Sequence, residues 1–468
     1  MNLLLKTAAR NILRNARRSL MTGSAVAAGA AAMMLFGGFV SYIFAGLETI
    51  NVQRVGHLSV FRSGYFLFGS GNPAAYGIDD YQHVIDLISN DATIRPLLTV
   101  VTPTQSLVGI AGNFSGGAEA SKTFLGVGLI PSARDRMRMW DERHTGQVHR
   151  ADNRLSDSDE SRGIVGVGLA RILGLCGPLH IPHCPAAPVE GAGKAQAPKP
   201  REDLVDLAKL ESAPGGAKKD EAPQLELLGA TVGGAPNVVS LTVAGAEPQG
   251  VRELDDNYIA MHLALAQQLV YGRGEHKVTA IVLQLHRSED VPLVRARLQQ
   301  IFADHHLDLE VRDFRDLSPF YVQVVAMFGT IFIFISAVMG VIVLFAVVNT
   351  MTMNVMERTN EIGTIRALGV RRGGVRAQFI LEGALIGAVG ATIGALIALA
   401  VAAAVNHAGL TWVPPGNSAP TPFHVDVADR PLLVLGTWLV LTLVAMSAAL
   451  LPANRAARLS VVDALRHV

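Results

Sequence analysis

The sequence predicts a membrane α-helical protein with four transmembrane helices and a large mixed α/β periplasmic domain inserted after the first helix. Half of the 468 residues are hydrophobic, which is more than a chain of ordinary soluble domains contains. Four segments are apolar over about 20 residues or more, the length that crosses a bilayer. The predicted spans are residues 20–46, 320–354, 377–405 and 431–451.

The first span follows a basic segment, residues 1–19, which has five lysines and arginines and no acidic residue. Leu5 and Ile12 fall on one side of a helix that carries Arg10 and Arg14 on another side. This pattern predicts an amphipathic helix at the membrane surface. The alternative is a run of positive charge that only orients the protein. The apolar part of 20–46 is longer than the core of a secretory signal, so we expect a retained helix.

The distribution of charge predicts the topology. Residues 355–376 contain five arginines and two glutamates, whereas residues 47–318 contain 26 basic and 33 acidic residues. Because basic residues concentrate on the cytoplasmic side, we expect both termini and 355–376 in the cytoplasm of a bacterium, and 47–319 in the periplasm. The net charge of +1 gives no basic excess for binding nucleic acid.

Region 47–319 shows strand and helix patterns near both of its ends, which predicts one split α/β domain with a second lobe between. The predicted strands are 56–61, 97–110, 278–285 and 307–311, and the predicted helices are 79–89 and 290–303. Residues 185–223 are rich in alanine, proline, glycine and lysine, a composition typical of a flexible insertion.

The segment between the second and third spans, 355–376, predicts a short amphipathic helix. Ile362, Ile365 and Leu368 recur at helical spacing, and Gly369 favours an end to the helix there. Such a helix could dock on a partner protein, or it could lie on the membrane with its arginines against lipid phosphates. The second span has surplus residues that would form a stalk above the bilayer.

The third span carries four glycines at small-x-x-x-small spacing, which predicts close helix packing. They are Gly383, Gly387, Gly390 and Gly394. Glu382 has two interpretations: a functional carboxylate inside the membrane, or a charge at headgroup depth beside Arg372 and Arg376. The second is favoured, because a charge costs little at that depth. Residues 406–430 and 452–468 are expected to be a periplasmic loop and a cytoplasmic tail.

The sequence contains no phosphate-binding loop, no nucleophile elbow and no His-Glu-x-x-His motif. We therefore predict no catalytic residue, no metal and no cofactor in this chain. Cys176 and Cys184, the two cysteines, predict a disulfide in an oxidising compartment. A zinc site with His180 and His183 is an alternative, although four ligands within nine residues are crowded. Free thiols are a third.

The run Glu357-Arg358, Glu361-Ile362-Gly363 and Arg366-Ala367-Leu368-Gly369, followed by Glu382, resembles the signature of the FtsX-like permease family. That family includes macrolide-efflux and lipoprotein-releasing permeases. The closing residues 452–458 and 464–466 resemble its C-terminal motif. The resemblance implies that 355–376 is a coupling helix, bound by a separate ABC-type ATPase that holds ATP and Mg²⁺. The residues implied in coupling are Glu357, Arg358, Glu361, Ile362, Gly363, Arg366, Leu368 and Gly369, with Glu361 and Arg366 expected to contact the ATPase.

The resemblance further implies a non-catalytic permease subunit that works with a second copy or a related permease and transmits motion to its periplasmic domain. We expect lipoprotein or lipid extraction towards the outer membrane, with membrane lipid and a periplasmic adaptor or carrier as further partners. The alternatives are macrolide or peptide efflux, and a non-transporting signal transmitter that activates cell-wall hydrolases. The large external region argues against the transmitter.

Overall fold

The computed structural model describes residues 2–459 except 70, 72, 115–119, 147–154, 182–183, 185–221, 273, 275 and 414–419. The predicted flexible insertion, 185–223, therefore lies almost wholly outside the described residues, as does most of the predicted tail. The chain divides into two compact units, each described by itself. The first contains residues 1–48, 319–412 and 421–468, and the second contains residues 49–318 and 413–420.

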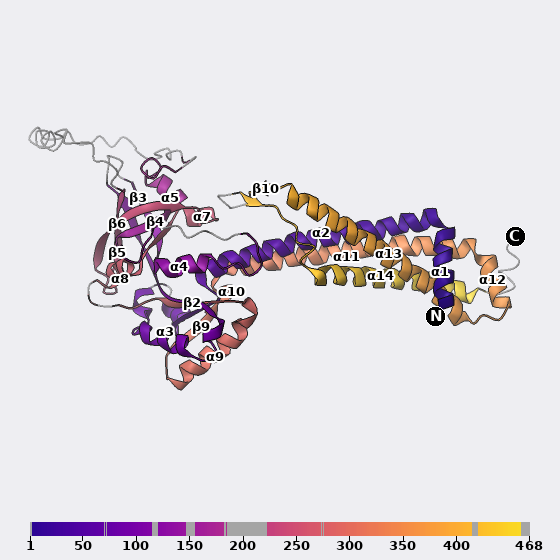
Figure 1. Cartoon of the computed structure of the whole chain (residues 1–468), viewed down its shortest axis with the longest axis horizontal. Coiled ribbons are helices and arrows are strands. Elements are labelled where there is room, and N and C mark those ends of the chain that lie inside the picture. The colour runs from indigo at the N-terminus through magenta and orange to yellow at the C-terminus, as the bar shows by residue number, and fades with distance from the viewer. Residues whose placement is uncertain are drawn as a thin grey trace, which may run out of the picture. The chain divides into compact units, whose positions relative to one another are not determined.

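The first unit is helical (Figure 1). Among the described residues, four helices are long and apolar enough to cross a membrane. They are α2 (Ala16–Val55), α11 (Pro319–Glu357), α13 (Arg372–His407) and α14 (Pro431–Arg458). Two shorter helices, α1 (Asn2–Arg14) and α12 (Thr359–Ala367), lie at one end of this unit. The amphipathic segment predicted over 1–19 thus ends at Arg14, because the chain breaks its helix at Asn15 and residues 16–19 continue into α2.

The four glycines of α13 lie where neighbouring helices approach closely. A Cβ atom at Gly383 or Gly387 would lie 2.6 or 2.7 Å from a methyl group of α14, Ala449 or Ala445. At Gly394 it would lie 2.5 Å from the carbonyl oxygen of Ala27 in α2, and Gly390 approaches Val26 in the same way. The small residues therefore pack the first half of α13, at Gly383 and Gly387, against α14. They pack the second half, at Gly390 and Gly394, against α2. Side chains around Ala391, Leu441 and Ala445 form the core of this bundle.

The second unit is mixed α/β, as the sequence predicts, and its described residues form a nine-stranded sheet in the order β3-β7-β4-β6-β5-β2-β8-β1-β9. The strands are β1 (Leu58–Arg62), β2 (Leu98–Asn113), β3 (Ala120–Leu129), β4 (Arg162–Gly166), β5 (Gln224–Ala230), β6 (Pro236–Glu247), β7 (Tyr258–His262), β8 (Ala280–Leu285) and β9 (Leu309–Asp313). The helices are α3 (Tyr81–Asn90), α4 (Pro131–Arg138), α5 (Val167–Ile172), α7 (Arg252–Asp255), α8 (Leu263–Tyr271), α9 (Val291–Asp304) and α10 (Phe314–Leu317).

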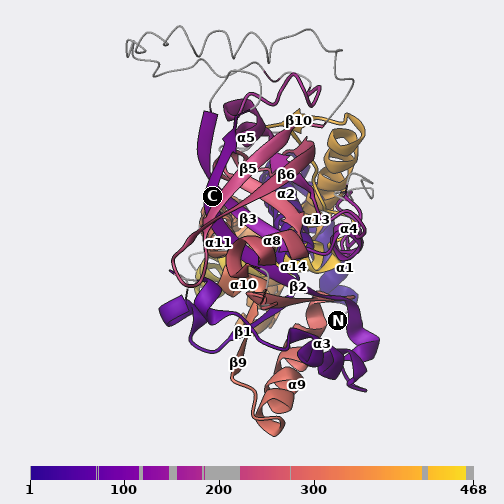
Figure 2. The ribbon, with the colours of Figure 1, turned by 90° about the vertical axis from the view of Figure 1, so that its left-hand side faces the viewer.

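The long strand β2 belongs to two hydrophobic cores. Its first half pairs with β8, and its second half pairs with both β3 and β5, so six strands close into a ring. Helix α8 packs against the ring strands (Figure 2). One core contains residues from both ends of the region, from β1 and α3 to β8 and α9. The other contains residues from its middle, which is the division that the alternating patterns predict.

Helix α2 passes into β1 through a single glycine. Gly56 has φ +70°, and a Cβ there would lie 2.6 Å from the carbonyl oxygen of Leu283. Only glycine fits this combination of backbone angle and close approach. The next residue, His57, is fully buried, and its backbone nitrogen donates to the same carbonyl at 2.8 Å.

Candidate functional site

The candidate site is the connection between α11 and α13, which contains α12. Ile362 and Gly363 are buried against the helical bundle, whereas Leu368 is 81% exposed. Helix α12 ends at Ala367, and Gly369 follows with φ +94°, a left-handed turn that favours glycine. The chain then enters α13 at Arg372. The helix predicted to end near Gly369 therefore ends two residues earlier, and the glycine forms the turn.

Glu361, on α12, binds two arginines from different parts of the chain. Its carboxylate accepts from Nη2 of Arg14 in α1 at 2.7 Å and from Nε of Arg358 at 3.1 Å. The hydrogen bond from Arg14, together with the one from Arg358, lowers the pKa of Glu361, although partial burial opposes the shift. Glu361 is therefore ionised at neutral pH and joins α1 to the start of α12.

Glu382, on α13, is buried and also has two partners. Its side chain is 2% exposed, and it accepts from Nη1 of Arg358 at 3.1 Å and from Nδ2 of Asn11 at 2.7 Å. The guanidinium of Arg358 lies over the ring of Phe379 at 5.8 Å. The expected neighbours Arg372 and Arg376 are not the observed partners. Arg358, the residue between α11 and α12, is buried and binds Glu382 instead.

Further polar contacts join the same helices. Nη1 of Arg18 lies 2.5 Å from Glu357, and the hydroxyls of Thr22 and Thr350 are 2.5 Å apart. Arg366 donates to the backbone carbonyl of Leu459, just past the end of α14. Glu361 and Arg366, the two residues expected to contact an ATPase, thus both have partners within the chain.

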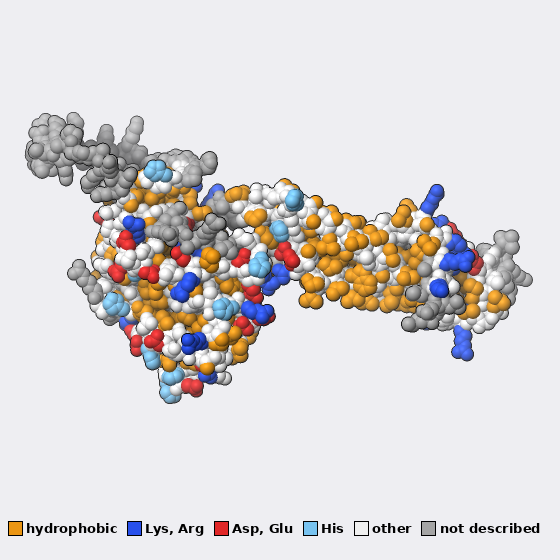
Figure 3. Space-filling model, in the orientation of Figure 1, with side chains coloured by type: hydrophobic (Ala, Val, Ile, Leu, Met, Phe, Trp, Pro, Cys, Tyr) orange, Lys and Arg blue, Asp and Glu red, His pale blue; other side chains and the backbone are white. Residues whose placement is uncertain are grey.

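The segment has a continuous exposed turn over residues 367–372, which we call the α12–α13 tip. Leu368 and Val370 are its exposed apolar side chains, and Arg371 and Arg372 are exposed beside them. Within the part of the chain that the structure describes, neither arginine has an ion-pair partner. On the face shown in Figure 3, lysine and arginine gather at the end of this unit that carries α1 and α12.

A cavity of about 620 Å³ adjoins α12. Its lining includes Thr352, Met356 and Asn360 on one side, and Pro452 and Arg455 of α14 on the other. No group of three or more potential metal ligands occurs among the described residues. The α12–α13 tip thus offers a mixed apolar and cationic surface.

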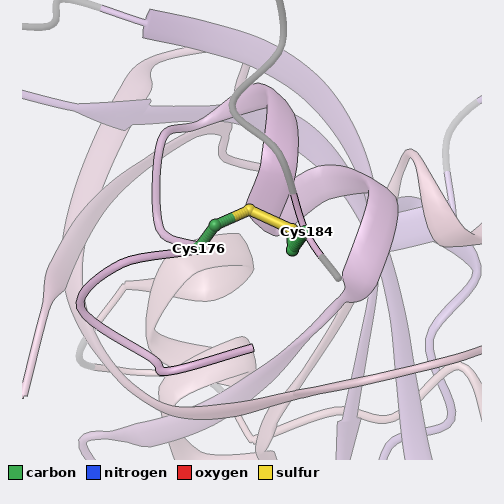
Figure 4. The surroundings of a disulfide bond; sticks show 2 residues. All are labelled: Cys176 and Cys184. Carbon is green, nitrogen blue, oxygen red and sulfur yellow. A yellow bond between two sulfur atoms is a disulfide. The ribbon is translucent and has the colours of Figure 1, made fainter. Parts of the chain in front are cut away.

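The cysteines lie in the other unit. Cys176 and Cys184 form a disulfide across a short loop after α5, with Cα atoms 5.7 Å apart (Figure 4). The two sulfur atoms are bonded to each other, so neither cysteine has a free thiol. Of the two histidines considered as zinc ligands, His183 lies outside the described residues.

The sequence does not predict the partners of the two carboxylates. It places Arg14 on the polar face of a predicted surface helix, or in a run of orienting positive charge, and it gives Asn11 no role. One signal is present: Asn11 and Arg14 lie one turn apart in a predicted helix, so they share a face. That face cannot be matched to Glu361 and Glu382 without a tertiary structure.

Comparison with known proteins finds a family model that matches this segment. Residues 333–461 match the family described as FtsX-like permease C-terminal. The match contains α12 and Glu382 but not α1 or the α/β unit.

Two relatives show how far the similarity reaches. Macrolide export ATP-binding/permease protein MacB of Neisseria meningitidis serogroup A is 34% identical over 131 residues, which are 28% of this chain and 18% of that protein. ABC transporter permease YknZ of Bacillus subtilis is 27% identical over 200 residues, 42% of this chain and 46% of YknZ. The chain thus covers less than half the length of these relatives.

Proposed function

Since residues 333–461 match the FtsX-like permease family, we propose that this chain is the membrane-spanning permease subunit of an ABC transporter. The observation that carries the proposal is the family match over the last part of the chain, together with the four membrane-length helices. The relatives are named as ABC permeases or as ATP-binding/permease proteins. The sequence given has no phosphate-binding loop, so ATP and Mg²⁺ would be bound by an ATPase outside it.

The proposed topology places α1, α12 and the end of α14 in the cytoplasm and the α/β unit in the periplasm. Its support is the basic charge of residues 1–19 and 355–376 and the excess of acid between 47 and 318. The arrangement of the first unit agrees, since α1, α12 and Leu459 lie at the same end of the bundle.

The ATPase contact is proposed to be the α12–α13 tip. Arg372 precedes Phe379, the first residue of the apolar run of α13, by seven residues, a rise of about 10 Å. The headgroup layer is only about 5–8 Å thick on each side, so the tip would project beyond the lipid into solvent. A groove with apolar walls and an acidic rim on the ATPase would fit Leu368, Val370 and the flanking arginines.

Substitution of Leu368 by glutamate tests this contact. Because exposed apolar anchors contribute much of the affinity at such interfaces, we expect Leu368→Glu to weaken ATPase binding at least tenfold. Affinity would be measured in detergent or nanodiscs with the purified ATPase. Leu293→Glu, at an exposed leucine of α9, is the matched control and should bind normally. Unchanged binding by Leu368→Glu would remove the tip from the interface.

The cargo is proposed to be a lipoprotein or another lipid extracted towards the outer membrane. Efflux of a macrolide or peptide is the second candidate, and it is favoured by the names of the macrolide-exporter relatives. Native mass spectrometry of the protein purified with its ATPase separates the two. Stoichiometric lipid or lipopeptide released on addition of ATP supports extraction, whereas a bound adaptor without lipid cargo supports efflux.

A further inference from the structure

Helix α1 supplies two of the side chains that hold the candidate coupling segment, although it lies outside the family match. Asn11 and Arg14, one turn apart, donate to Glu382 and to Glu361 respectively, each at 2.7 Å. A single face of α1 thus contacts both α12 and α13. Figure 1 shows α1 crossing the end of the bundle beside α12.

The same network passes through a buried ion pair. Arg358 binds Glu361 and Glu382 at once, and its own side chain is only 9% exposed. Breaking a buried pair leaves an uncompensated charge, which costs far more than breaking an exposed one. Displacement of α12 away from α13 would break the buried Arg358–Glu382 pair. Displacement of α1, α12 and the start of α13 together would leave that pair intact. The contacts therefore favour movement of the three as one body.

Helix α1 is also joined directly to the first long helix. Asn15 is the only residue between α1 and α2. Just beyond it, Arg18 pairs with Glu357, and the Thr22 hydroxyl contacts that of Thr350. The start of α2 is thus attached to the end of α11 immediately before α12 begins.

We propose that α1 is a transmission element that carries a displacement of α12 to α2, with Asn11 and Arg14 as its positioning residues. The proposal rests on the proposed function, in which the ATPase pushes on the α12–α13 tip. It adds a direct route from the tip to α2 alongside the covalent routes through α11 and α13. The Arg14–Glu361 pair is about half exposed, at 53% and 45%, so its role is to direct α12 rather than to stabilise the fold.

The first experiment needs no ATPase. Amide hydrogen exchange of residues 359–367 is measured in the full-length protein in detergent, for wild type, Arg14→Glu and Arg14→Lys. Repulsion between the introduced carboxylate and Glu361 should release α12, so Arg14→Glu should exchange severalfold faster there, and Arg14→Lys should stay near wild type. Arg17→Glu is the matched control, because Arg17 is exposed and the described part of the chain offers it no ion-pair partner. Equal exchange in Arg14→Glu and Arg17→Glu overturns the proposal.

The second experiment adds the ATPase. Nitroxide labels at Leu20→Cys on α2 and Leu435→Cys on α14 report their separation with and without ATP, since both positions are exposed. We expect the ATP-dependent change to fall at least twofold in Arg14→Glu and to persist in Arg17→Glu and Arg14→Lys. A full-sized change in Arg14→Glu overturns transmission through α1. If wild type shows no change at all, the proposed function fails, and the exchange experiment still decides whether α1 positions α12.

Discussion

Glu382 illustrates how a single residue can organise the end of a helical bundle. A buried carboxylate is tolerated when charged and polar donors compensate it, and Arg358 and Asn11 supply such donors. Arg358 in turn lies against Phe379 and reaches Glu361. The charged residues at this end thus hold the helices relative to one another, whereas Leu368 and Val370 of the tip are exposed.

His57 leads to a prediction at the same scale. Its ring is fully buried, accepts the backbone N–H of Leu285 on Nδ1 at 3.0 Å and packs edge-on against Trp140. Burial lowers the pKa of His57 to about 3 from its ordinary 6.5, because the cation loses its hydration. The contribution of His57 to the free energy of unfolding is therefore complete above pH 6.5. It is lost progressively as the pH falls towards 3, because the unfolded chain binds a proton at His57 before the folded chain does.

Lowering the pH from about 7.5 to about 5.5 should therefore reduce the free energy of unfolding of the α/β unit by about 1.4 kcal/mol through His57. Thermal or denaturant unfolding of the protein in detergent at the two pH values measures it. His57→Gln should be less stable at both values but should lose less on acidification. His305→Gln, which replaces an exposed histidine, should lose as much stability between the two pH values as wild type does. An identical pH dependence in His57→Gln and wild type would show that His57 does not titrate in this way.

At the scale of elements, α13 is the helix around which the bundle is packed. Gly383 and Gly387 face α14, and Gly390 and Gly394 face α2, so one helix receives two neighbours at close distance. Apolar side chains gain little by leaving lipid for another helix, and close packing of small residues supplies the attraction instead.

Gly394→Leu should separate α13 from α2. The new side chain would meet the carbonyl oxygen of Ala27 at 2.5 Å and the methyl of Ala30 at 2.6 Å. Overpacking of this kind costs about 1–3 kcal/mol, so we expect a lower midpoint of thermal unfolding and a smaller folded yield. Gly340→Leu, on α11, is the matched control, because nothing lies within 4 Å of a Cβ at that position. Equal effects of both changes would contradict the packing argument.

At the scale of the whole molecule, the charge pattern and the disulfide bear on the same question of topology. The cytoplasm keeps thiols reduced, whereas a periplasmic domain can hold Cys176 and Cys184 as a disulfide. The proposed periplasmic position of the α/β unit and the bond between these cysteines therefore support each other.

Thiol labelling of the protein extracted from its own membranes tests the topology. After denaturation without a reductant, a maleimide should label no cysteine, and after reduction it should label both. Arg371→Cys supplies a control on the proposed cytoplasmic side, which should be labelled in open membranes but not in intact spheroplasts. Two free thiols in freshly extracted wild-type protein would place the α/β unit in a reducing compartment.

The sequence by itself determined the four helices of membrane-spanning length, the mixed α/β character of the region between the first two, and the resemblance of the last part of the chain to a permease family. Each of these follows from local information: apolar length, the period of hydrophobic residues or a contiguous motif. Strands such as β1 and β8 and helices such as α3 and α9 lie within a few residues of their predicted ranges.

Only the tertiary structure decided which partners the charged residues around α12 meet. Arg14 and Glu361 are 347 positions apart and Asn11 and Glu382 are 371 apart, so no local pattern connects them. It also decided which neighbours the glycines of α13 meet and that one strand, β2, serves two cores. A polar side chain can satisfy its hydrogen bonds with many partners, and the partner that it meets depends on how all the helices pack together.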